Sequence, residues 1–172
     1  MIKLSILLLC EDGHGHVNPS ITIGQSLFRR GHRVIFAIDY AWRGKLIKEG
    51  FEQQLYGTGN NDTEYWPQLM KQLAPVFRLP VIQMMEKFLI AGEMKGIKDN
   101  MRNDLQFKAI INRINPDIII TDIPFCSPSL INSGIPWIYM HCANPLFNFL
   151  DKRAPPSCSG MNQYVNIKLF KC

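Results

Sequence analysis

The first 60 residues alternate strand-length apolar runs with helix-like segments, and this alternation is the strongest constraint on the fold. The run "KLSILLLC" is apolar at nearly every position, as expected of a strand covered on both faces of a parallel sheet. The helical segment "SITIGQSLFRR" follows and ends at Gly31. The β-branched run "HRVIFAI" then ends at Asp39. This order predicts an α/β protein with a doubly wound, mainly parallel, Rossmann-like sheet.

The rest of the chain extends this order and interrupts it once. "AWRGKLIKEG" is predicted as a short helix ended by Gly50, and "FEQQLYG" as a third strand. Later, "PDIIITDIPF", "SPSLINSG" and "IPWIYMHCA" predict a strand, a short helix ended by Gly134 and a fifth strand. Between these two parts, residues 61–115 have a helical pattern that prolines interrupt. We expect residues 1–172 to form one Rossmann-like domain.

The loop after the first strand, "EDGHGHVNPS", lies where open parallel sheets bind ligands, at the carboxyl ends of the strands. Asn18 is predicted to cap the following helix and Pro19 to occupy its first position, where the missing N–H costs nothing. Gly13 and Gly15 are expected to let the loop turn. The two histidines, His14 and His16, have no such conformational explanation.

Composition excludes several classes of protein. In 172 residues, 47% are hydrophobic, which argues against disorder, and 19% are charged, which is compatible with an uncovered apolar face. The net charge of +5 is dispersed and favours a solvated surface over a nucleic-acid site. Five cysteines without a CxxC pair indicate a reducing, cytoplasmic setting and no zinc-site spacing. No apolar stretch reaches the ~20 residues of a membrane span.

Polar residues at other strand ends offer partners for a histidine in this loop. Asp122 follows "IIIT" and His141 follows "WIYM". A carboxylate that accepts a hydrogen bond from one ring nitrogen fixes the tautomer, and the other nitrogen is then free to accept a proton from a substrate hydroxyl. The alternative is that His14 and His16 are surface residues and that Asp122 only caps a turn. Spacing alone favours this alternative.

The loop also matches part of a dinucleotide-binding fingerprint. Gly13-x-Gly15 supplies two of its glycines, and Asp39 ends the second strand where a ribose-binding acid would lie. The third glycine position holds Asn18, followed by Pro19. A dinucleotide-binding domain therefore remains an alternative with incomplete support.

The stretch "GHGHVNPSITIGQSLFRRGHRVIFA" resembles the N-terminal signature of UDP-glycosyltransferases of the GT-B fold. In that family an apolar strand precedes G-H-x-x-P and a helix that ends in L-x-x-R-G-H-x-V. The matching residues are Gly15, His16, Pro19, Leu27, Arg30, Gly31, His32 and Val34. "PDIIITDIPF" resembles the family's strand that ends in an aspartate supporting the catalytic histidine, and "APPSCSG" resembles a later proline-rich segment.

The resemblance implies one half of a GT-B fold, the N-terminal, acceptor-binding domain of an inverting enzyme. It implies that His16 is the general base and Asp122 its partner, whereas His14 does not match the base position. The substrates implied are a UDP-sugar donor and a small apolar acceptor, with no metal and no other cofactor. We expect the acceptor to contact a surface that includes these residues: Gly15, Phe125, Met140, Met84 and Phe88.

The family's histidine- and glycine-rich donor-binding signature is absent from the sequence. We therefore expect a chain without its donor domain: a fragment, a truncated product or one subunit of a two-chain enzyme. Such a chain is expected to be inactive until a partner chain supplies the donor domain. A non-catalytic binding module, or a partner subunit that performs no chemistry, is the competing hypothesis.

Overall fold

The computed structural model describes residues 2–58, 70–123 and 127–142. The chain divides into two compact units. One contains residues 1–64 and 96–142, and the other contains residues 65–95 and 143–172. The candidate site and the sheet belong to the first unit.

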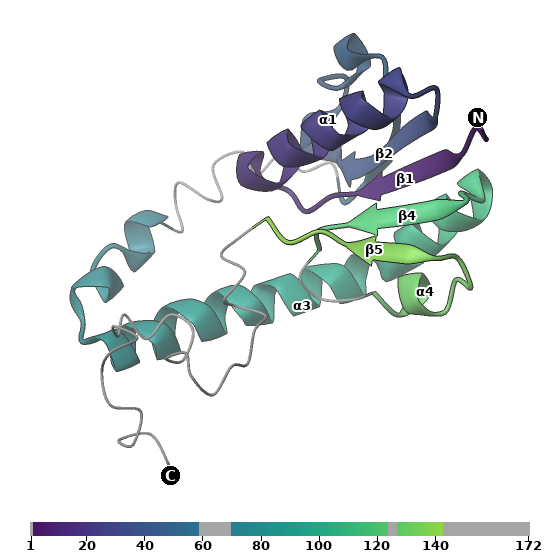
Figure 1. The fold of residues 1–172 in the computed structure, drawn as a ribbon. Coiled ribbons are helices and arrows are strands. Elements are labelled where there is room, and N and C mark those ends of the chain that lie inside the picture. Colours follow the sequence, from purple (N-terminus) through teal and green to yellow (C-terminus); the bar gives the residue numbers. More distant parts are fainter. Residues whose placement is uncertain (1, 59–69, 124–126, 143–172) are drawn as a thin grey trace, which may run out of the picture. The chain divides into compact units, whose positions relative to one another are not determined.

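A five-stranded parallel sheet forms the centre of the first unit (Figure 1). Its strands are β1 (Ser5–Leu9), β2 (Arg33–Asp39), β3 (Glu52–Tyr56), β4 (Ile118–Thr121) and β5 (Trp137–Tyr139). The spatial order is β3-β2-β1-β4-β5, and every neighbouring pair is parallel. The predicted doubly wound parallel sheet is confirmed. The order reverses between β1 and β4, and in such sheets this is the place where ligands bind.

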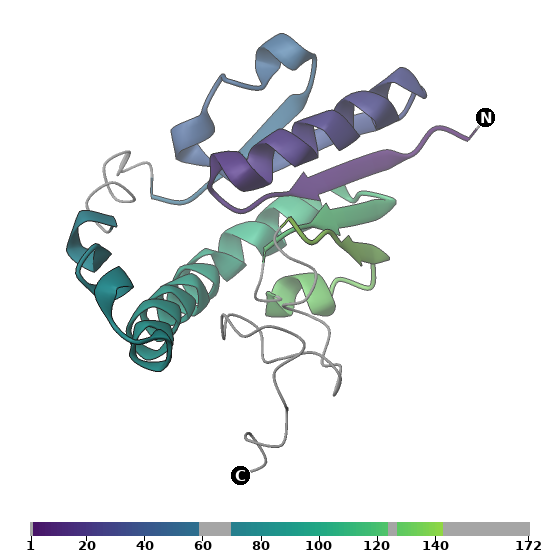
Figure 2. The same ribbon diagram turned by 60° about the vertical axis from the view of Figure 1, so that its left-hand side comes forward.

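Helices cover both faces of the sheet (Figures 1 and 2). α1 (His14–Arg29) lies on one face. The second half of α3 (Val81–Ile114) and α4 (Pro128–Ile131) lie on the other. Successive β1 residues therefore enter different cores: Leu8 joins Val17 of α1 in one cluster, and Leu9 joins Phe107 of α3 in the other. Burial on both faces explains why this strand is apolar at consecutive positions.

α1 begins upstream of its predicted start. The N–H groups of His16 and Val17 donate to the Gly13 carbonyl at 3.0 and 2.9 Å, so a helical turn precedes Pro19. The prediction that Asn18 caps the helix and Pro19 opens it is wrong, since Gly13 is the N-cap and Pro19 lies inside. His16 therefore belongs to the first turn of a helix, which holds its side chain more firmly than a loop.

The expected conformational role of the two glycines is also wrong. Gly13 has φ 164°, extended backbone that any residue adopts, and Gly15 lies in the helix. A Cβ on Gly15 would meet no heavy atom within 4 Å, so this residue leaves open space on an exposed helical turn. What Gly15 contributes is the absence of a side chain beside His16.

The segment after β2 is less regular than predicted. Two short 3-10 helices, η1 (Tyr40–Trp42) and η2 (Ile47–Glu49), replace the expected single helix. Gly44 lies between them with φ 76°, a left-handed conformation that interrupts a right-handed helix. Gly50, with φ 82°, ends η2, as predicted.

The second unit contains η3 (Val76–Arg78) and the first half of α3. α3 begins directly after Pro80, one of the prolines expected to interrupt the helical pattern of residues 61–115. The rings of Phe77 and Phe88 pack with their centroids 5.2 Å apart. No helix within the described ranges is both long and apolar enough to cross a bilayer.

Candidate functional site

The candidate site lies at the carboxyl ends of β1 and β4, where the strand order reverses. Asp122 follows β4 directly, and its N–H donates to the carbonyl of Leu9, the last residue of β1, at 3.4 Å. The chain continues from β1 into α1, whose first turn carries His16. Parallel pairing of β1 with β4 therefore brings together residues 106 positions apart in the sequence.

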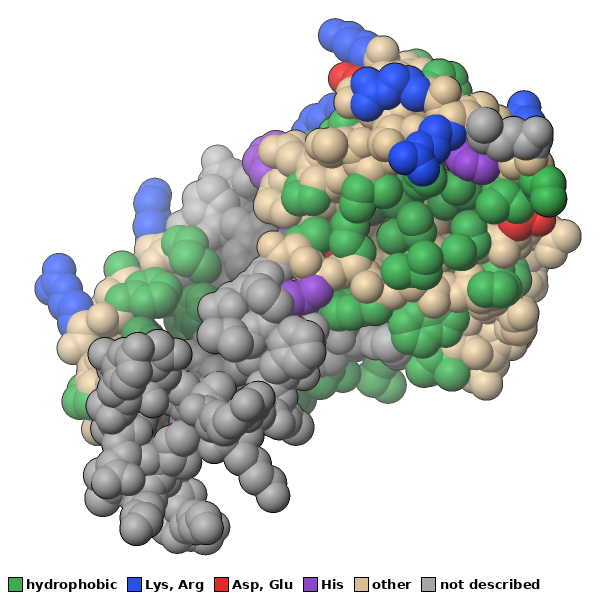
Figure 3. Space-filling model, viewed as in Figure 1, with side chains coloured by type: hydrophobic (Ala, Val, Ile, Leu, Met, Phe, Trp, Pro, Cys, Tyr) green, Lys and Arg blue, Asp and Glu red, His purple; other side chains and the backbone are tan. Residues whose placement is uncertain are grey.

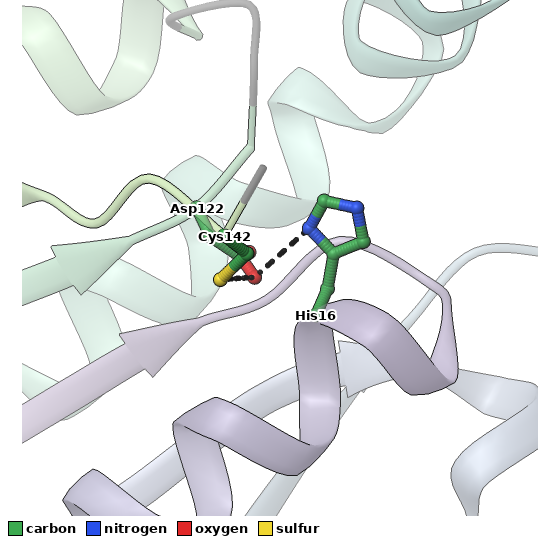
Figure 4. A group of neighbouring side chains, drawn as sticks. All are labelled: His16, Asp122 and Cys142. Atoms are coloured by element: carbon green, nitrogen blue, oxygen red, sulfur yellow. Dashed lines mark hydrogen bonds and ion pairs between the residues drawn. The ribbon is translucent and has the colours of Figure 1, made fainter. Parts of the chain in front are cut away.

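The carboxylate of Asp122 is fully buried and has three hydrogen-bond donors (Figure 4). Its Oδ1 accepts the backbone N–H of Glu11 at 2.7 Å. Its Oδ2 lies 3.2 Å from Nδ1 of His16 and accepts from Sγ of Cys142 at 3.5 Å. A buried carboxylate is costly unless it is hydrogen-bonded, and these donors meet that need.

His16 connects this buried carboxylate to the surface. Its side chain is 34% exposed, whereas that of Asp122 is 0% exposed. Pairing of Nδ1 with the carboxylate fixes the tautomer in which Nδ1 carries the proton, so Nε2 is left as an acceptor. In Figure 4, Nε2 lies on the side of the ring that faces away from Asp122.

The pKa of His16 is raised above its ordinary value. The hydrogen bond to Asp122 is the main cause, and the charges of Asp122 and Glu11 act in the same direction. Partial burial opposes the shift by disfavouring the charged ring. An imidazole in this environment is a stronger base than a free one, as abstraction of a hydroxyl proton requires.

Cys142 is the site residue that the sequence analysis missed, since the spacing of the five cysteines gave none of them a role in a site. It lies beyond β5, beside His141, and its thiol reaches the same carboxylate oxygen as His16. Burial and the charge of Asp122 raise the pKa of the Cys142 thiol to about 11. The thiol is therefore protonated at neutral pH and donates to Asp122. The signal available was its position next to a polar residue at a strand end.

His14, the other histidine of the loop, packs against an aromatic side chain. Its ring meets Trp42 edge-on with the centroids 4.9 Å apart. Trp42 in turn donates its indole N–H to Asp12 at 2.8 Å. Packing on Trp42 accounts for a histidine at position 14 without assigning it a catalytic role.

The second half of the sequence signature has a structural role. Gly31, with φ 88°, follows the end of α1 in the left-handed conformation. Nδ1 of His32 accepts the N–H of Leu4 at 3.2 Å, which ties the turn before β2 to the start of β1. These residues align α1 with the two central strands.

The predicted acceptor-binding residues have different positions. Gly15 is exposed in the first turn of α1, one residue before His16. Met140 is half-buried, and its N–H donates at 2.7 Å to the carbonyl of Thr121, next to Asp122. Met84 and Phe88 are half-buried on α3 within the second unit. Phe125 lies outside the described residues. The acceptor role of all five residues stays a prediction.

Asp39, the residue behind the dinucleotide alternative, has a local explanation. Its Oδ1 accepts the N–H of Ala41 at 2.9 Å and so caps η1. Burial raises the pKa of its carboxyl, although the hydrogen bond from Ala41 opposes this shift. Capping of η1 accounts for an acidic residue at the end of β2.

Comparisons with known proteins support the resemblance to glycosyltransferases. No protein-family model matches the chain. A curated relative, NDP-glycosyltransferase YjiC of Bacillus licheniformis, is 27% identical over 93 residues, which cover 54% of this chain and 24% of the relative.

Solved glycosyltransferases share the fold. The glycosyltransferase of kitacinnamycin is 20% identical with a TM-score of 0.56, over 83% of this chain and 31% of that one. CalG4, the calicheamicin glycosyltransferase, is 21% identical with a TM-score of 0.54, over 81% and 30%. SsfS6 of Streptomyces sp. SF2575 is 18% identical with a TM-score of 0.56, over 79% and 38%.

The chain has the Rossmann-like fold of these glycosyltransferases. The resemblance to enzymes of the GT-B fold is confirmed at this level. The chain spans about a quarter of the curated relative and about a third of each solved structure, so the similarity is to part of those proteins.

Proposed function

We propose that this chain is the acceptor-binding half of an inverting glycosyltransferase, which transfers a sugar from a sugar nucleotide to a hydroxyl of a small apolar acceptor. The observation that carries the proposal is the His16–Asp122 pair. It lies at the reversal of strand order, with a buried carboxylate behind the ring and a ring nitrogen directed away from it. In sheets of this kind, ligands bind at that edge.

The arrangement suits a single-displacement reaction. Nε2 of His16 takes the proton of the acceptor hydroxyl as its oxygen attacks the anomeric carbon from the face opposite the nucleotide. The bond from that carbon to the phosphate oxygen breaks, and the nucleoside diphosphate leaves with the electron pair. Configuration inverts because attack and departure occur on opposite faces. Asp122 stabilises the imidazolium that His16 becomes.

Two nucleotides, UDP and TDP, are candidates for the donor. The signature in this sequence resembles that of UDP-dependent enzymes. A solved relative, SsfS6, binds thymidine diphosphate, and the curated relative is described as an NDP-glycosyltransferase. We propose UDP-sugar as the first donor to test, with the TDP-sugar as its comparison, and a second domain or partner chain as the part that binds the nucleotide.

The acceptor surface is proposed to begin beside His16. Gly15 presents bare backbone there, so an acceptor can approach the first turn of α1 closely. Met140 follows β5, and its N–H donates to the carbonyl of Thr121, the residue before Asp122. Methionine side chains adapt to irregular apolar ligands and phenylalanine rings offer a large apolar area, which favours Met84, Phe88 and Phe125 as further contacts.

The test joins the full chain to the donor domain of a matched glycosyltransferase and measures transfer from UDP- and TDP-sugars to a panel of hydroxylated apolar acceptors. His16→Ala is expected to lower kcat/KM by ~10²–10⁴-fold, since it removes the base. His14→Ala is the matched control, because it removes the neighbouring histidine that packs on Trp42.

Equal transfer by the His16→Ala and wild-type assemblies would exclude His16 as the base. Acceptor binding without transfer by any assembly would favour the non-catalytic binding module instead.

A further inference from the structure

Three potential metal ligands meet at the candidate site. They are Nδ1 of His16, Oδ2 of Asp122 and Sγ of Cys142, and all three atoms lie within 4.8 Å of one another (Figure 4). The three residues come from α1, from the end of β4 and from beyond β5, so the sheet order itself assembles the group. Imidazole, carboxylate and thiolate are the ligand types that zinc prefers.

The spacing of these atoms is close to that around a tetrahedral zinc ion. Zinc bonds of 2.0–2.3 Å at tetrahedral angles place neighbouring ligand atoms about 3.4–3.6 Å apart. In the structure, Oδ2 lies 3.2 Å from Nδ1 and 3.5 Å from Sγ. Two of the three separations therefore need almost no change, and the third is already below 4.8 Å.

The surroundings of the carboxylate suit coordination. Oδ1 of Asp122 is held by the N–H of Glu11, so Oδ2 is oriented toward the other two ligands. Such outer hydrogen bonds typically strengthen metal sites. A thiolate and a carboxylate also balance the double charge of the cation, so the buried group has no net charge. His16 is partly exposed, which gives the cation a route from solvent.

We propose that His16, Asp122 and Cys142 bind a thiophilic divalent cation, with zinc as the first candidate and water in the fourth position. On binding, the Cys142 thiol releases its proton to solvent and the ring proton of His16 moves from Nδ1 to Nε2, so that the metal on Nδ1 replaces the hydrogen bond between His16 and Asp122. In the proposed function, base catalysis by His16 and metal binding exclude one another. The binding itself does not depend on that function.

Direct metal titration of the reduced, full-length chain tests the proposal. Zinc is added in competition with a chromophoric chelator, and Co²⁺ is added separately to record its absorption spectrum. We expect one zinc site per chain, and a thiolate-to-cobalt charge-transfer band with the intense visible bands of tetrahedral Co²⁺. Zinc is also expected to raise the melting temperature, because it binds only the folded site.

Cys142→Ser is the decisive variant, since its hydroxyl still donates to Asp122 but is a poor zinc ligand. It is expected to weaken zinc binding by more than about 10-fold and to lose the charge-transfer band. Cys10→Ala is the matched control. It removes a buried thiol that is not one of the three ligands, and it should leave both readouts unchanged. The same measurements in a background with Cys126, Cys158 and Cys172 changed to alanine remove any contribution from those thiols.

Zinc binding that Cys142→Ser leaves intact, or wild-type chain that gives no charge-transfer band, would overturn the proposal. Neither result would bear on sugar transfer, since the transfer assay uses His16→Ala and no added metal.

Discussion

His16 and Asp122 differ in burial, and this difference decides which nitrogen of the ring is held by the carboxylate and which one faces outward. A carboxylate with no solvent contact is held by Glu11 and Cys142 as well as by the ring, so it cannot turn away to bind water. The ring remains partly exposed and presents its second nitrogen outward. A proton taken up at Nε2 is therefore stabilised from behind by a charge that is fixed in place.

If His16 is the base, as the proposed function has it, this arrangement predicts the pH profile of transfer by the chain joined to a donor domain. His16 acts as a base only when neutral, so kcat/KM should fall as the pH drops through its pKa. The midpoint should lie above the ordinary histidine value of about 6.5, because the hydrogen bond to Asp122 raises the pKa. Asp122→Asn removes the negative charge and should move the midpoint to lower pH. His14→Ala should leave it in place.

An acid limb that Asp122→Asn does not move would show that the titrating group is not His16. Retained sheet structure, checked by circular dichroism, is needed in both variants for the comparison.

Gly57 gives a second prediction at the scale of single residues. Its φ is 92°, and a Cβ there would lie 2.4 Å from Oδ2 of Asp39. Gly57→Ala therefore adds a clash to the left-handed strain of about 1–2 kcal/mol. Gly31→Ala is the matched control, since φ is 88° and a Cβ would meet nothing within 4 Å. Urea denaturation should show a larger loss of unfolding free energy for Gly57→Ala.

Equal losses for the two alanine variants would mean that Asp39 moves aside at no cost. That result would also show that the position from which Asp39 caps η1 does not depend on residue 57 lacking a Cβ.

The sequence indicated two of the three site residues, and it did so through the resemblance. Spacing alone favoured a surface position for His16 and a turn-capping role for Asp122, because nothing local distinguishes them from other polar residues at strand ends. Cys142 was missed, since the contact of its thiol with Asp122 depends on β4 and β5 being neighbours. The purpose of the glycines was misjudged because backbone angles are not visible in a sequence.

At the scale of elements, Asp104 fastens α4 to α3. Its Oδ1 accepts from the Ser127 hydroxyl and, at 3.0 Å, from the N–H of Ser129; its Oδ2 accepts from the Ser129 hydroxyl at 2.7 Å. Burial by itself would raise the pKa of this carboxyl, but the hydrogen bonds from both serines outweigh it and lower the pKa. One side chain thus supports the start of a helix that is only four residues long.

Asp104→Asn is expected to lower the unfolding free energy by about 1 kcal/mol near neutral pH, because the hydrogen bonds lose their charge assistance. Because the pKa of Asp104 is lower in the folded state, its charged carboxylate stabilises the fold at pH values above the unfolded pKa of about 3.9. This stabilisation is lost as the pH falls through the folded pKa. The difference between variant and wild type should therefore shrink below pH ~4. Denaturant titrations at several pH values measure it.

Asp99→Asn is the matched control, the same substitution on the same helix in an exposed pair with Arg102. It should cost only a few tenths of a kcal/mol. A difference for Asp104→Asn that persists in acid would contradict the assigned role of its charge.

Element types followed from the sequence more readily than element boundaries. β1 and β2 are buried on both faces, so their sequences are continuous apolar runs that are easily recognised as strands. The start of α1 was misplaced because Pro19 and Asn18 carry strong local preferences that the turn at Gly13 overrides. The helix predicted after β2 was too regular, since a left-handed glycine, Gly44, interrupts it.

At the scale of the whole molecule, the sheet ends at a partly uncovered edge. β5 is an outer strand of three residues, and its Trp137 and Ile138 are 38% and 51% exposed. Hydrophobic side chains gather over the sheet on the face that Figure 3 shows. Exposed apolar area of this kind accords with the low share of charged residues in the sequence.

The last prediction concerns the 172-residue chain by itself. Sugar transfer requires the acceptor oxygen to be held close to the anomeric carbon, and much of the rate comes from that positioning. The proposed function gives this chain a base and an acceptor surface, whereas the matched glycosyltransferases are about three times as long as the region shared with it. We expect weak binding of UDP-sugar and negligible turnover, measured by calorimetry and by release of UDP.

A donor domain added in trans should raise transfer, and His16→Ala should abolish that gain. Assays of the wild-type chain alone, of the donor domain alone and of both together separate what each of them contributes to the rate of transfer. Efficient transfer by the chain alone would place the donor site within these 172 residues, near the same strand ends. This chain would then bind both the acceptor and the donor. Weak binding that strengthens only with the donor domain present would instead show that the two halves hold the sugar nucleotide between them.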